Sequence, residues 1–271
     1  MKLPLLLLFL FFPYMASIAQ EVDTVNGIHR IDLGMSVGSY SSVDQLGSPL
    51  RYHSTTAPVL LEYQYDHPNI HQELYLSLCV SGANASALRP SLSDDQFDRV
   101  ALLVDGECYY SYLRTVVSDS ISSIRIQLGA SLDNIGSFRR YKYRGSDFYT
   151  PGGIATWEAA SMLGATMNIE YKLSISLRSK ASFSLPLLSA IVRPPFDFFH
   201  TESSVIEGSD GHIVAIGGMG GYRFSAGLEY DIGSHITLGA QFISRFFRYE
   251  RYGWTSAWLH QGGMLTLGWR I

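Results

Sequence analysis

Two short groups of residues could support acid–base chemistry. Asp210 stands two residues before His212, and Asp94 is followed directly by Asp95. An imidazole can act as a general base on a water or a substrate group within hydrogen-bond reach. Short acid pairs are also common in exposed segments, so the alternative is solvated loop acids and a histidine at a rim. The elements that carry these residues decide whether the two groups can meet.

A third group of residues is basic and aromatic. It lies in the segment 137–149, SFRRYKYRGSDFY, and comprises Arg139, Arg140, Lys142 and Arg144 together with Tyr141 and Tyr143. Arginine and lysine suit phosphate or carboxylate groups, and aromatic rings suit the faces of sugars. The segment therefore predicts binding of lipopolysaccharide phosphates or acidic glycans. The alternative is a tall hairpin whose tyrosines mark an aromatic girdle.

The first 19 residues, MKLPLLLLFLFFPYMASIA, have the form of a secretory signal peptide. Lys2 supplies a short positive region, residues 3–12 are apolar, and Ser17 and Ala19 are small residues before a cut. The apolar block is too short to span a bilayer. We therefore expect a signal peptide at 1–19 and one mature domain at 20–271.

The mature part is weakly charged and rich in tyrosine and glycine. The chain has 20 Lys and Arg against 24 Asp and Glu, and loss of the leader removes Lys2 alone. This acidic balance argues against a nucleic-acid partner. Charged residues make up 16%, with 17 Tyr and 25 Gly, and no apolar run after the leader is long enough for a transmembrane helix. An exported chain of this composition predicts a transmembrane β-barrel.

Ten segments alternate between apolar and polar residues, with the period of two of a strand that has one apolar face. They lie at about 29–40, 59–66, 73–80, 108–117, 124–130, 163–171, 175–185, 214–232, 236–246 and 262–271. Closed bacterial barrels have an even number of strands. The expected fold class is therefore all-β, a transmembrane antiparallel up-and-down β-barrel of about ten strands. In such a barrel the last strand pairs with the first, so that no edge remains in lipid.

The connections between these segments alternate in length. Short links fall near 68–71, 118–120, 173–174 and 231–235, and long ones cover 41–57, 83–107, 133–160 and 193–211, with a shorter one at 252–258. Short periplasmic turns and longer extracellular loops are the outer-membrane pattern, so both termini are expected on the periplasmic side. Asp94 and Asp95 would lie in the second long loop, the basic segment in the third, and Asp210 and His212 at the end of the fourth.

The same alternation predicts what fills the lumen. Seven acids and eight bases would point inward: Asp32, Glu62, Asp66, Glu73, Glu170, Glu229 and Asp231, with Arg114, Arg125, Lys172, Arg178, Lys180, Arg223, Arg245 and Arg270. A nearly balanced set would pair, because unpaired buried charge is costly. Barrels of roughly eight strands have filled lumens, and aqueous porin channels take about 16–18. A plugged lumen is therefore expected in place of a general porin.

Histidines and cysteines give no clear site. His67 and His71 flank a predicted turn near Asp66 and Glu73, but no closed ligand set with structural-zinc spacing occurs, so we expect no metal and no cofactor. Cys79 and Cys108 border the second long loop on consecutive strands. Export permits a disulfide, but Cys79 is in an inward register, and the pairing stays open.

Both ends of the chain resemble those of known exported proteins. The ending GGMLTLGWRI resembles the C-terminal signal of bacterial outer-membrane barrels, in which alternating apolar residues finish on an aromatic; here Ile271 is last and Trp269 supplies the aromatic. The SIA–Q junction at 17–20 resembles that of secreted proteins of Bacteroidota-type bacteria. The chain thus resembles small outer-membrane β-barrel proteins of Gram-negative bacteria. This implies an outer-membrane location after signal-peptide cleavage, with the assembly machinery, outer-membrane lipid and lipopolysaccharide as partners.

The two acid groups are similar to those of omptins, ten-stranded outer-membrane proteases. Their loops carry an Asp pair and an Asp-His pair that together activate a water. The family's first pair is spaced by one residue, whereas Asp94 and Asp95 are adjacent. No His-x-Ser occurs, which removes the pattern of the outer-membrane lipid A deacylases and phospholipases.

The sequence favours a barrel with a side-chain-filled lumen that presents extracellular loops for binding or accessory roles and is not an enzyme. Three alternatives stay open. They are a narrow porin-like transport channel, an omptin-like outer-membrane aspartyl protease, and an accessory barrel of a protein secretion system. The oligomeric state is not indicated.

Overall fold

The protein is represented by a computed structural model that describes residues 27–44, 50–87, 100–119, 123–141, 154–193, 210–215, 218–251 and 254–271. Its strands are β1 (Ile28–Asp44), β2 (Leu50–Thr56), β3 (Val59–Asp66), β4 (Ile70–Ala87), β5 (Val100–Asp119), β6 (Ile124–Tyr141), β7 (Ile154–Lys172), β8 (Leu177–Arg193), β9 (Asp210–Ala215), β10 (Met219–Ile232), β11 (Ile236–Arg251) and β12 (Trp254–Arg270). The described part of the chain contains no helix long and apolar enough to span a bilayer. The expected signal peptide at 1–19 lies outside the described residues.

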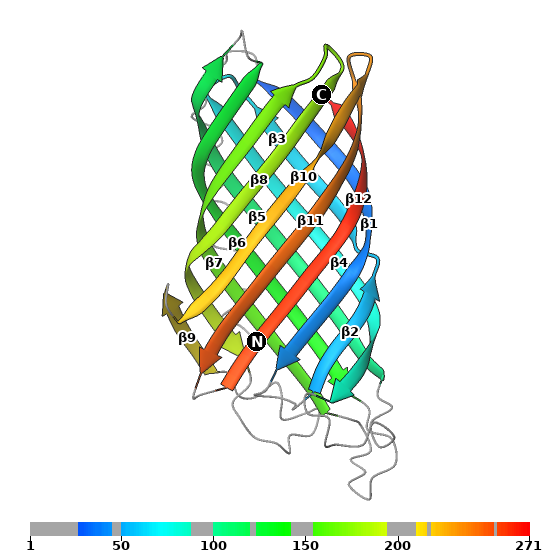
Figure 1. The fold of residues 1–271 in the computed structure, drawn as a ribbon, viewed down its shortest axis with the longest axis vertical. Helices are drawn as coiled ribbons and strands as arrows, with labels where there is room; N and C mark the ends of the chain where they lie inside the picture. Colours follow the sequence, from blue (N-terminus) through cyan, green and yellow to red (C-terminus); the bar gives the residue numbers. More distant parts are fainter. Residues whose placement is uncertain are drawn as a thin grey trace, which may run out of the picture.

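The strands form one closed antiparallel barrel with ten positions around its wall (Figure 1). β2 and β3 share one position between β1 and β4, in one continuous register. They are separated at Pro58, which has no N–H to donate to the ladder. β9 and β10 share a second position beside β8. Since β12 pairs with β1 from Arg270–Arg30 to Ser256–Asp44, the sheet closes, and the predicted fold class is confirmed.

The two ends of the barrel differ. One end, here called the turn end, carries the links 67–69, 173–176 and 233–235, together with the end of β5 at Asp119 and the start of β6 at Ile124; the opposite end is called the loop end. Figure 1 shows the turn end at the top, with the C-terminus of the chain beside it. Gly233, with a φ of 68°, permits the tight link between β10 and β11.

Strands continue into segments that the sequence analysis assigned to long loops. β2 lies within 41–57, β5 begins within 83–107, and β6 and β7 extend into 133–160. The alternation is hidden in β5 because both of its faces are apolar there. Leu102 is exposed on the outside, whereas Leu103 is buried in the lumen. A strand cannot be recognised from the alternation of polar and apolar residues where the lumen face is hydrophobic as well.

The outer face carries an apolar band and the inner face carries polar residues, as a lipid-facing barrel requires. Exposed apolar side chains recur on every second residue, as in Leu33, Met35 and Val37 of β1, while Asp32 and Ser36, which have the opposite facing, are buried. Four exposed aromatic residues lie near the turn end: Tyr63, Tyr171, Tyr230 and Trp269. They correspond to an aromatic girdle at one membrane interface.

The predicted inward position of Arg114 is wrong. In β5, Tyr109 and Leu113 face the lumen at 2% and 1% exposure, and Arg114 is exposed on the outside. The cause is a β-bulge between Thr115 and Val117. A bulge adds one residue to one strand, so it reverses which residues face inward on its two sides.

Cys79 and Cys108 are both free thiols. In the ladder between β4 and β5, Cys79 is opposite Asp105, and Cys108 is opposite Leu76. Cys79 faces the lumen, whereas Cys108 lies between the inward residues Glu107 and Tyr109 and therefore faces outward. The barrel wall separates the two sulfur atoms, which excludes the disulfide.

Deleting Leu265–Ile271 should prevent closure of the barrel. This stretch pairs with β1 on one side and with β11 on the other, so its loss leaves two open edges. After refolding into detergent micelles, the truncated chain should lack the compact, heat-modifiable band of a closed barrel in gel electrophoresis. Deletion of Ile271 alone, which removes one backbone bond to His29, is the control and should keep that band. A heat-modifiable band from the longer truncation would show that β12 is not needed for closure.

Candidate functional site

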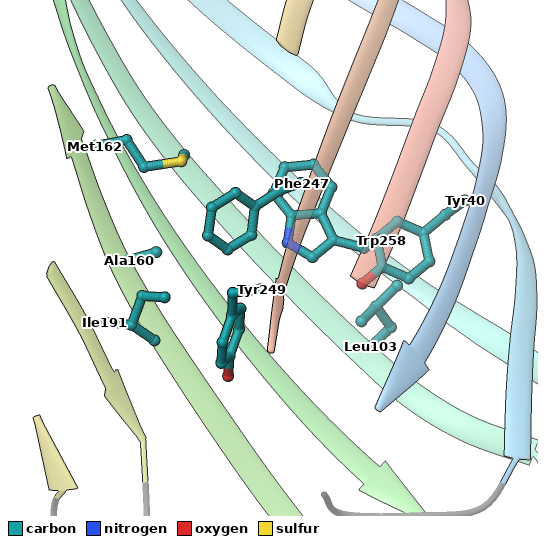
Figure 2. Close-up of a cluster of buried hydrophobic side chains, with 8 residues drawn as sticks. All are labelled: Tyr40, Leu103, Ala160, Met162, Ile191, Phe247, Tyr249 and Trp258. Carbon is teal, nitrogen blue, oxygen red and sulfur yellow. The ribbon is translucent and has the colours of Figure 1, made fainter. Parts of the chain in front are cut away.

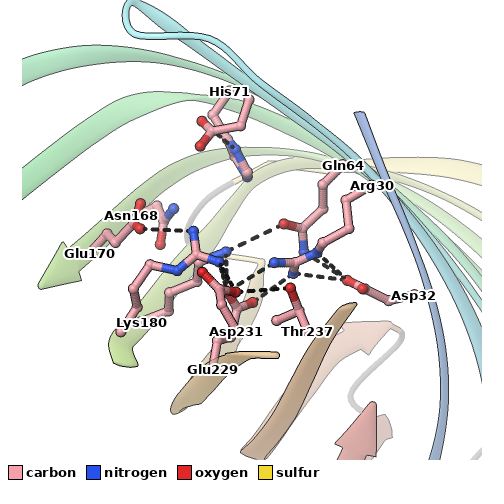
Figure 3. Close-up of polar contacts among 12 residues, drawn as sticks. Arg30, Asp32, Gln64, His71, Asn168, Glu170, Lys180, Glu229, Asp231 and Thr237 are labelled. Carbon is pink, nitrogen blue, oxygen red and sulfur yellow. Dashed lines mark hydrogen bonds and ion pairs between the residues drawn. The ribbon is translucent and has the colours of Figure 1, made fainter. Parts of the chain in front are cut away.

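The lumen nearest the turn end is filled by a network of ion pairs, here called the ion-pair layer (Figure 3). It comprises Arg30, Asp32, Asp66, Arg125, Glu170, Arg178, Lys180, Glu229, Asp231 and Arg270. Arg30 donates from Nε to Asp32 at 2.9 Å, and its two terminal nitrogens donate to Glu229 at 2.9 and 2.6 Å. These bonds join β1 to β10 across the lumen.

Most acids of the ion-pair layer meet more than one base, which links the individual pairs into one network. Glu229 lies 3.0 Å from Lys180 and 3.3 Å from Arg178, in addition to Arg30. Asp231 lies 3.1 Å from Arg178 and also accepts from Arg270. Charge-assisted bonds of this kind offset the cost of taking ions out of water when every partner is satisfied.

A second layer, the arginine layer, lies farther from the turn end. Glu107 forms ion pairs with both Arg223 and Arg245, which stand opposite each other in β10 and β11. The Arg223 guanidinium also lies over the rings of Tyr75 and Tyr109, at 4.5 and 4.2 Å from their centroids. Cation–π contacts add stabilisation for a cation that is removed from water. The second terminal nitrogen of Arg245 lies 2.8 Å from His260.

The third layer, the aromatic layer, is a hydrophobic cluster inside the lumen toward the loop end (Figure 2). It consists of Tyr40, Leu103, Ala160, Met162, Ile191, Phe247, Tyr249 and Trp258. The ring of Phe247 lies 5.8 Å from Tyr249 and 5.9 Å from Trp258, between centroids. The Tyr249 hydroxyl donates to Glu158 at 2.7 Å and accepts from Arg193 at 2.8 Å.

Two small cavities adjoin the arginine layer, and both are lined in part by Arg245 and Trp258. The larger, which also meets Glu107 and His260, offers about 40 Å³ to the centres of water molecules, which is room for a few waters. Among the described residues, no group of His, Cys, Asp and Glu side chains is arranged to hold a metal ion. The three layers can thus obstruct axial passage.

The loop residues predicted from the sequence are only partly described. Asp94, Asp95, Lys142, Tyr143 and Arg144 lie outside the described residues. Arg139, Arg140 and Tyr141 have their backbone in β6, at its loop end.

The backbones of Asp210 and His212 lie in β9, where they pair with Arg193 and Ile191 of β8. Both partners are buried and face the lumen. The backbones of Asp210 and His212 therefore stand at the loop end of the barrel, opposite these two residues. Their distance from Asp94 and Asp95 falls outside what the structure describes.

Several lumen residues were missing from the sequence analysis. Arg30, Glu158, Arg193 and His260 are all buried, and Glu107 bridges the two arginines. Arg30 lies two residues before Asp32 in β1 and therefore faces the same side of the sheet. Extending the alternation of β1 by two residues toward the N-terminus would have predicted its inward position. Glu107 and Glu158 lay in assumed loops. Lys172, predicted to face inward, is exposed near the turn end.

Comparison with known proteins supports the fold. The outer membrane protease OmpT from Escherichia coli matches over 93% of this chain and 99% of its own, with a TM-score of 0.57 and 12% identity. A major outer membrane protein from Thermus thermophilus matches over 90% and 99%, with a TM-score of 0.39 and 9% identity. The Pseudomonas putida toluene transporter TodX matches over 94% and 91%, with a TM-score of 0.35 and 11% identity. No family model and no curated protein matches the chain. The similarity to OmpT shows that the chain has the fold of an outer-membrane β-barrel.

Replacing Arg30 by Leu should destabilise the barrel strongly. Arg30 is 6% exposed, and its loss leaves Asp32 and Glu229 short of their partner. Breaking a buried pair costs on the order of 3–5 kcal/mol when the site is dry, and less where water enters. The measurement is the temperature at which the folded band disappears in a heating series. Arg114→Leu, the same exchange at an exposed position, is the matched control. Equal shifts for the two variants would contradict the ion-pair layer.

Proposed function

We propose that this protein is an integral outer-membrane barrel that does not conduct along its axis and that uses its extracellular loops for binding. The apolar outer band, the aromatic residues at the turn end and the fold shared with OmpT support the membrane location. The turn end then faces the periplasm, and the loop end faces outward.

The filled lumen is the observation that carries the proposal. Side chains from opposite walls meet at three heights, first as ion pairs, then around Glu107, and finally as the aromatic layer. An ion that moved along the axis would have to displace Phe247 and Trp258, which are 1% and 8% exposed. Ten strands lie near the size at which side chains fill a barrel.

The wild-type protein should give no steady conductance in planar bilayers. Phe247→Ala together with Trp258→Ala should stay silent as well, because the ion-pair layer and the arginine layer still cross the lumen; a current in this variant would show that the aromatic layer alone blocks the axis. Leu265→Ala, which shortens an exposed residue on the outer face, is the control and should stay silent. Steady current through the wild type would favour the narrow transport channel.

The loop end is where a ligand would bind in this proposal. Arg139, Arg140, Lys142 and Arg144, with Tyr141 and Tyr143, form a segment that consists of basic and aromatic residues alone. Guanidinium groups suit phosphates, and rings suit sugars. Lipopolysaccharide, which carries both, is the expected ligand class.

Replacing Arg139, Arg140, Lys142 and Arg144 by Ser should weaken binding of lipopolysaccharide, and wild-type affinity should fall as salt is added, because exposed charges are screened. Binding can be followed by surface plasmon resonance with the barrel in nanodiscs. Replacing Arg114, an exposed base near the turn end, by Ser should leave the affinity unchanged. Equal affinity of the fourfold variant would remove the support for this ligand.

A second candidate function is proteolysis of the omptin type. One observation favours it: Asp210 and His212 stand at the loop end, opposite the inward residues Arg193 and Ile191. If these residues act with Asp94 or Asp95, cells that display the protein should cleave peptides between basic residues. His212→Ala should abolish the cleavage, because a general base is lost, and should leave the heat-modifiable band. We expect no cleavage, and cleavage that depends on His212 would replace the binding proposal.

A further inference from the structure

Polar side chains recur at one height on the outer face of the barrel. They form what is here called the polar row, which comprises Ser39, Asn134, Ser161, Ser244 and Gln261. These side chains point outward, because their neighbours in the chain, such as Ala160 and Met162 beside Ser161, face the lumen. Within the row, Ser39 is opposite Gln261, Gln261 is opposite Ser244, and Asn134 is opposite Ser161.

The polar row marks the outer boundary of the lipid-facing band. Its members are eight to eleven residues from the turn-end limits of their strands. With a rise of about 3.3 Å per residue and a tilt of about 40°, they lie roughly 20–28 Å from the turn end. This height agrees with an apolar band about 25 Å tall. Residues farther toward the loop end therefore stand beyond the hydrocarbon of the membrane.

Beyond the polar row, β2 and β11 expose polar side chains. Those that are exposed in the described part of these strands are Arg51, His53, Arg248 and Glu250. Counted through β3 for the first two, they are twelve to fifteen residues from the turn end, which corresponds to roughly 30–38 Å. Charged groups belong outside the hydrocarbon, because a charge on the lipid face is destabilising. This side of the barrel thus changes from apolar to polar where the lipid ends.

The other side of the barrel exposes apolar side chains beyond the polar row. They belong to β5, β6, β8 and β9 and are Leu102, Phe138, Ala190 and Ile213. Ile213 is 75% exposed, and Leu102 and Phe138 are 43% and 38% exposed. Because β5 to β9 are consecutive in the wall, these residues form one surface, here called the apolar face. Figure 1 shows β9 on the left and β2 on the right near the loop end.

The sizes of its residues make the apolar face flatter than a curved wall would otherwise be. Leu102 and Phe138 on one flank and Ile213 on the other are large, whereas Ala159 and Ala190 between them are small. Five strands about 4.8 Å apart, over about twelve residues of 3.3 Å each, span roughly 24 by 40 Å. The resulting area of about 950 Å² exceeds the roughly 800 Å² that each partner buries in a standard protein interface.

We propose that the apolar face binds a second copy of this chain, related to the first by a twofold axis along the membrane normal. An apolar surface of this kind beyond the lipid marks contact with another protein. Placed against the β11–β2 side of another copy, it would bury Arg51, Arg248 and Glu250 against apolar groups, which is costly. The apolar face therefore meets itself, and such a contact closes at two copies.

The polar row is compatible with this arrangement. Asn134 and Ser161 lie beside the apolar face, and an amide and a hydroxyl can each both donate and accept. Identical side chains can therefore pair across a twofold axis and leave the lipid. The inference goes beyond the proposed function, because it concerns the outer wall and neither the lumen nor the loop ligand.

Cross-linking of single thiols tests which side of the barrel meets the second copy. In a chain with Cys79→Ser and Cys108→Ser, Ala190→Cys places one thiol near the centre of the apolar face. Thr55→Cys places one at an exposed position of β2 and is the matched control. In isolated outer membranes, a short bismaleimide should link most of the Ala190→Cys chains into dimers. The control should be linked at least tenfold less.

Charges on the apolar face should dissociate the dimer. In detergent micelles, sedimentation equilibrium of the wild type should give a protein mass of two chains. Phe138→Glu together with Ile213→Glu should raise the dissociation constant at least tenfold, because two carboxylates per copy would be buried. Thr55→Glu adds a carboxylate on the opposite side and should leave the constant unchanged. The heat-modifiable band confirms that each variant folds.

Three results would overturn the inference. They are equal cross-linking of the two cysteine variants, a monomeric wild type in both the outer membrane and micelles, and an unchanged dissociation constant for the double Glu variant. A monomer in both settings would leave the apolar face to lipid or to a different protein. Conductance and lipopolysaccharide binding are measured separately, so failure here does not depend on the outcome for the plug or the loops.

Discussion

Closure of the ladder between β1 and β12 is the constraint on which the rest of the structure depends. In hydrocarbon no water is present to satisfy backbone groups, so a spanning sheet must pair every strand with two neighbours. Fifteen consecutive residue pairs, from Arg30–Arg270 to Asp44–Ser256, make the closing seam. Gly38 faces Gly262 across it, and a Cβ on Gly38 would collide with the backbone of Gln261. Close approach at the seam therefore depends on residues without side chains.

Closure with ten positions leaves a lumen that side chains can cross. Arg30 and Glu229 are 199 residues apart in sequence, yet they form a bidentate ion pair. Once such groups are enclosed, each must find a partner, because an unpaired buried charge is costly. Near the loop end the lumen is equally narrow, but there the aromatic rings of Phe247, Tyr249 and Trp258 fill it in place of ion pairs. The barrel thus has a charged interior toward its turn end and an aromatic interior toward its loop end.

The sequence predicted the fold because alternation and connection length act together over the whole chain. It also predicted that Glu229 and Arg178 face inward, because side chains alternate regularly along an unbroken strand, and the structure pairs these two residues. The predicted inward position of Arg114 was wrong, because the bulge near Thr115 reverses which side chains of β5 face the lumen, and no residue type in the sequence marks that bulge. It also failed for Glu107 and Glu158. Near these two residues, apolar residues of the aromatic layer face the lumen. Side chains still alternate between the lumen and the outside there, but both sets are apolar, so the sequence no longer alternates between polar and apolar residues. The loop candidates depend on residues that the structure describes only in part.

The bulges in β5 and β8 have different consequences, and the difference lies in what holds the wall together beside each of them. In β5 the ladder with β6 resumes at once beyond the bulge, so only the facing of side chains changes. In β8 the bulge at Leu187 adjoins Pro186, and the neighbouring position changes there from β10 to β9. The bulge, the proline and the change of neighbouring strand thus coincide. Between Ser184 and Leu188, β8 therefore has no pairing with β10 or β9. Side chains keep the wall closed at this place, because the ring of Pro186 packs against Gly221 of β10 and the Ser189 hydroxyl donates to the sulfur of Met219. A barrel wall can thus stay closed where its ladder stops, when close-packed side chains take the place of the missing pairing.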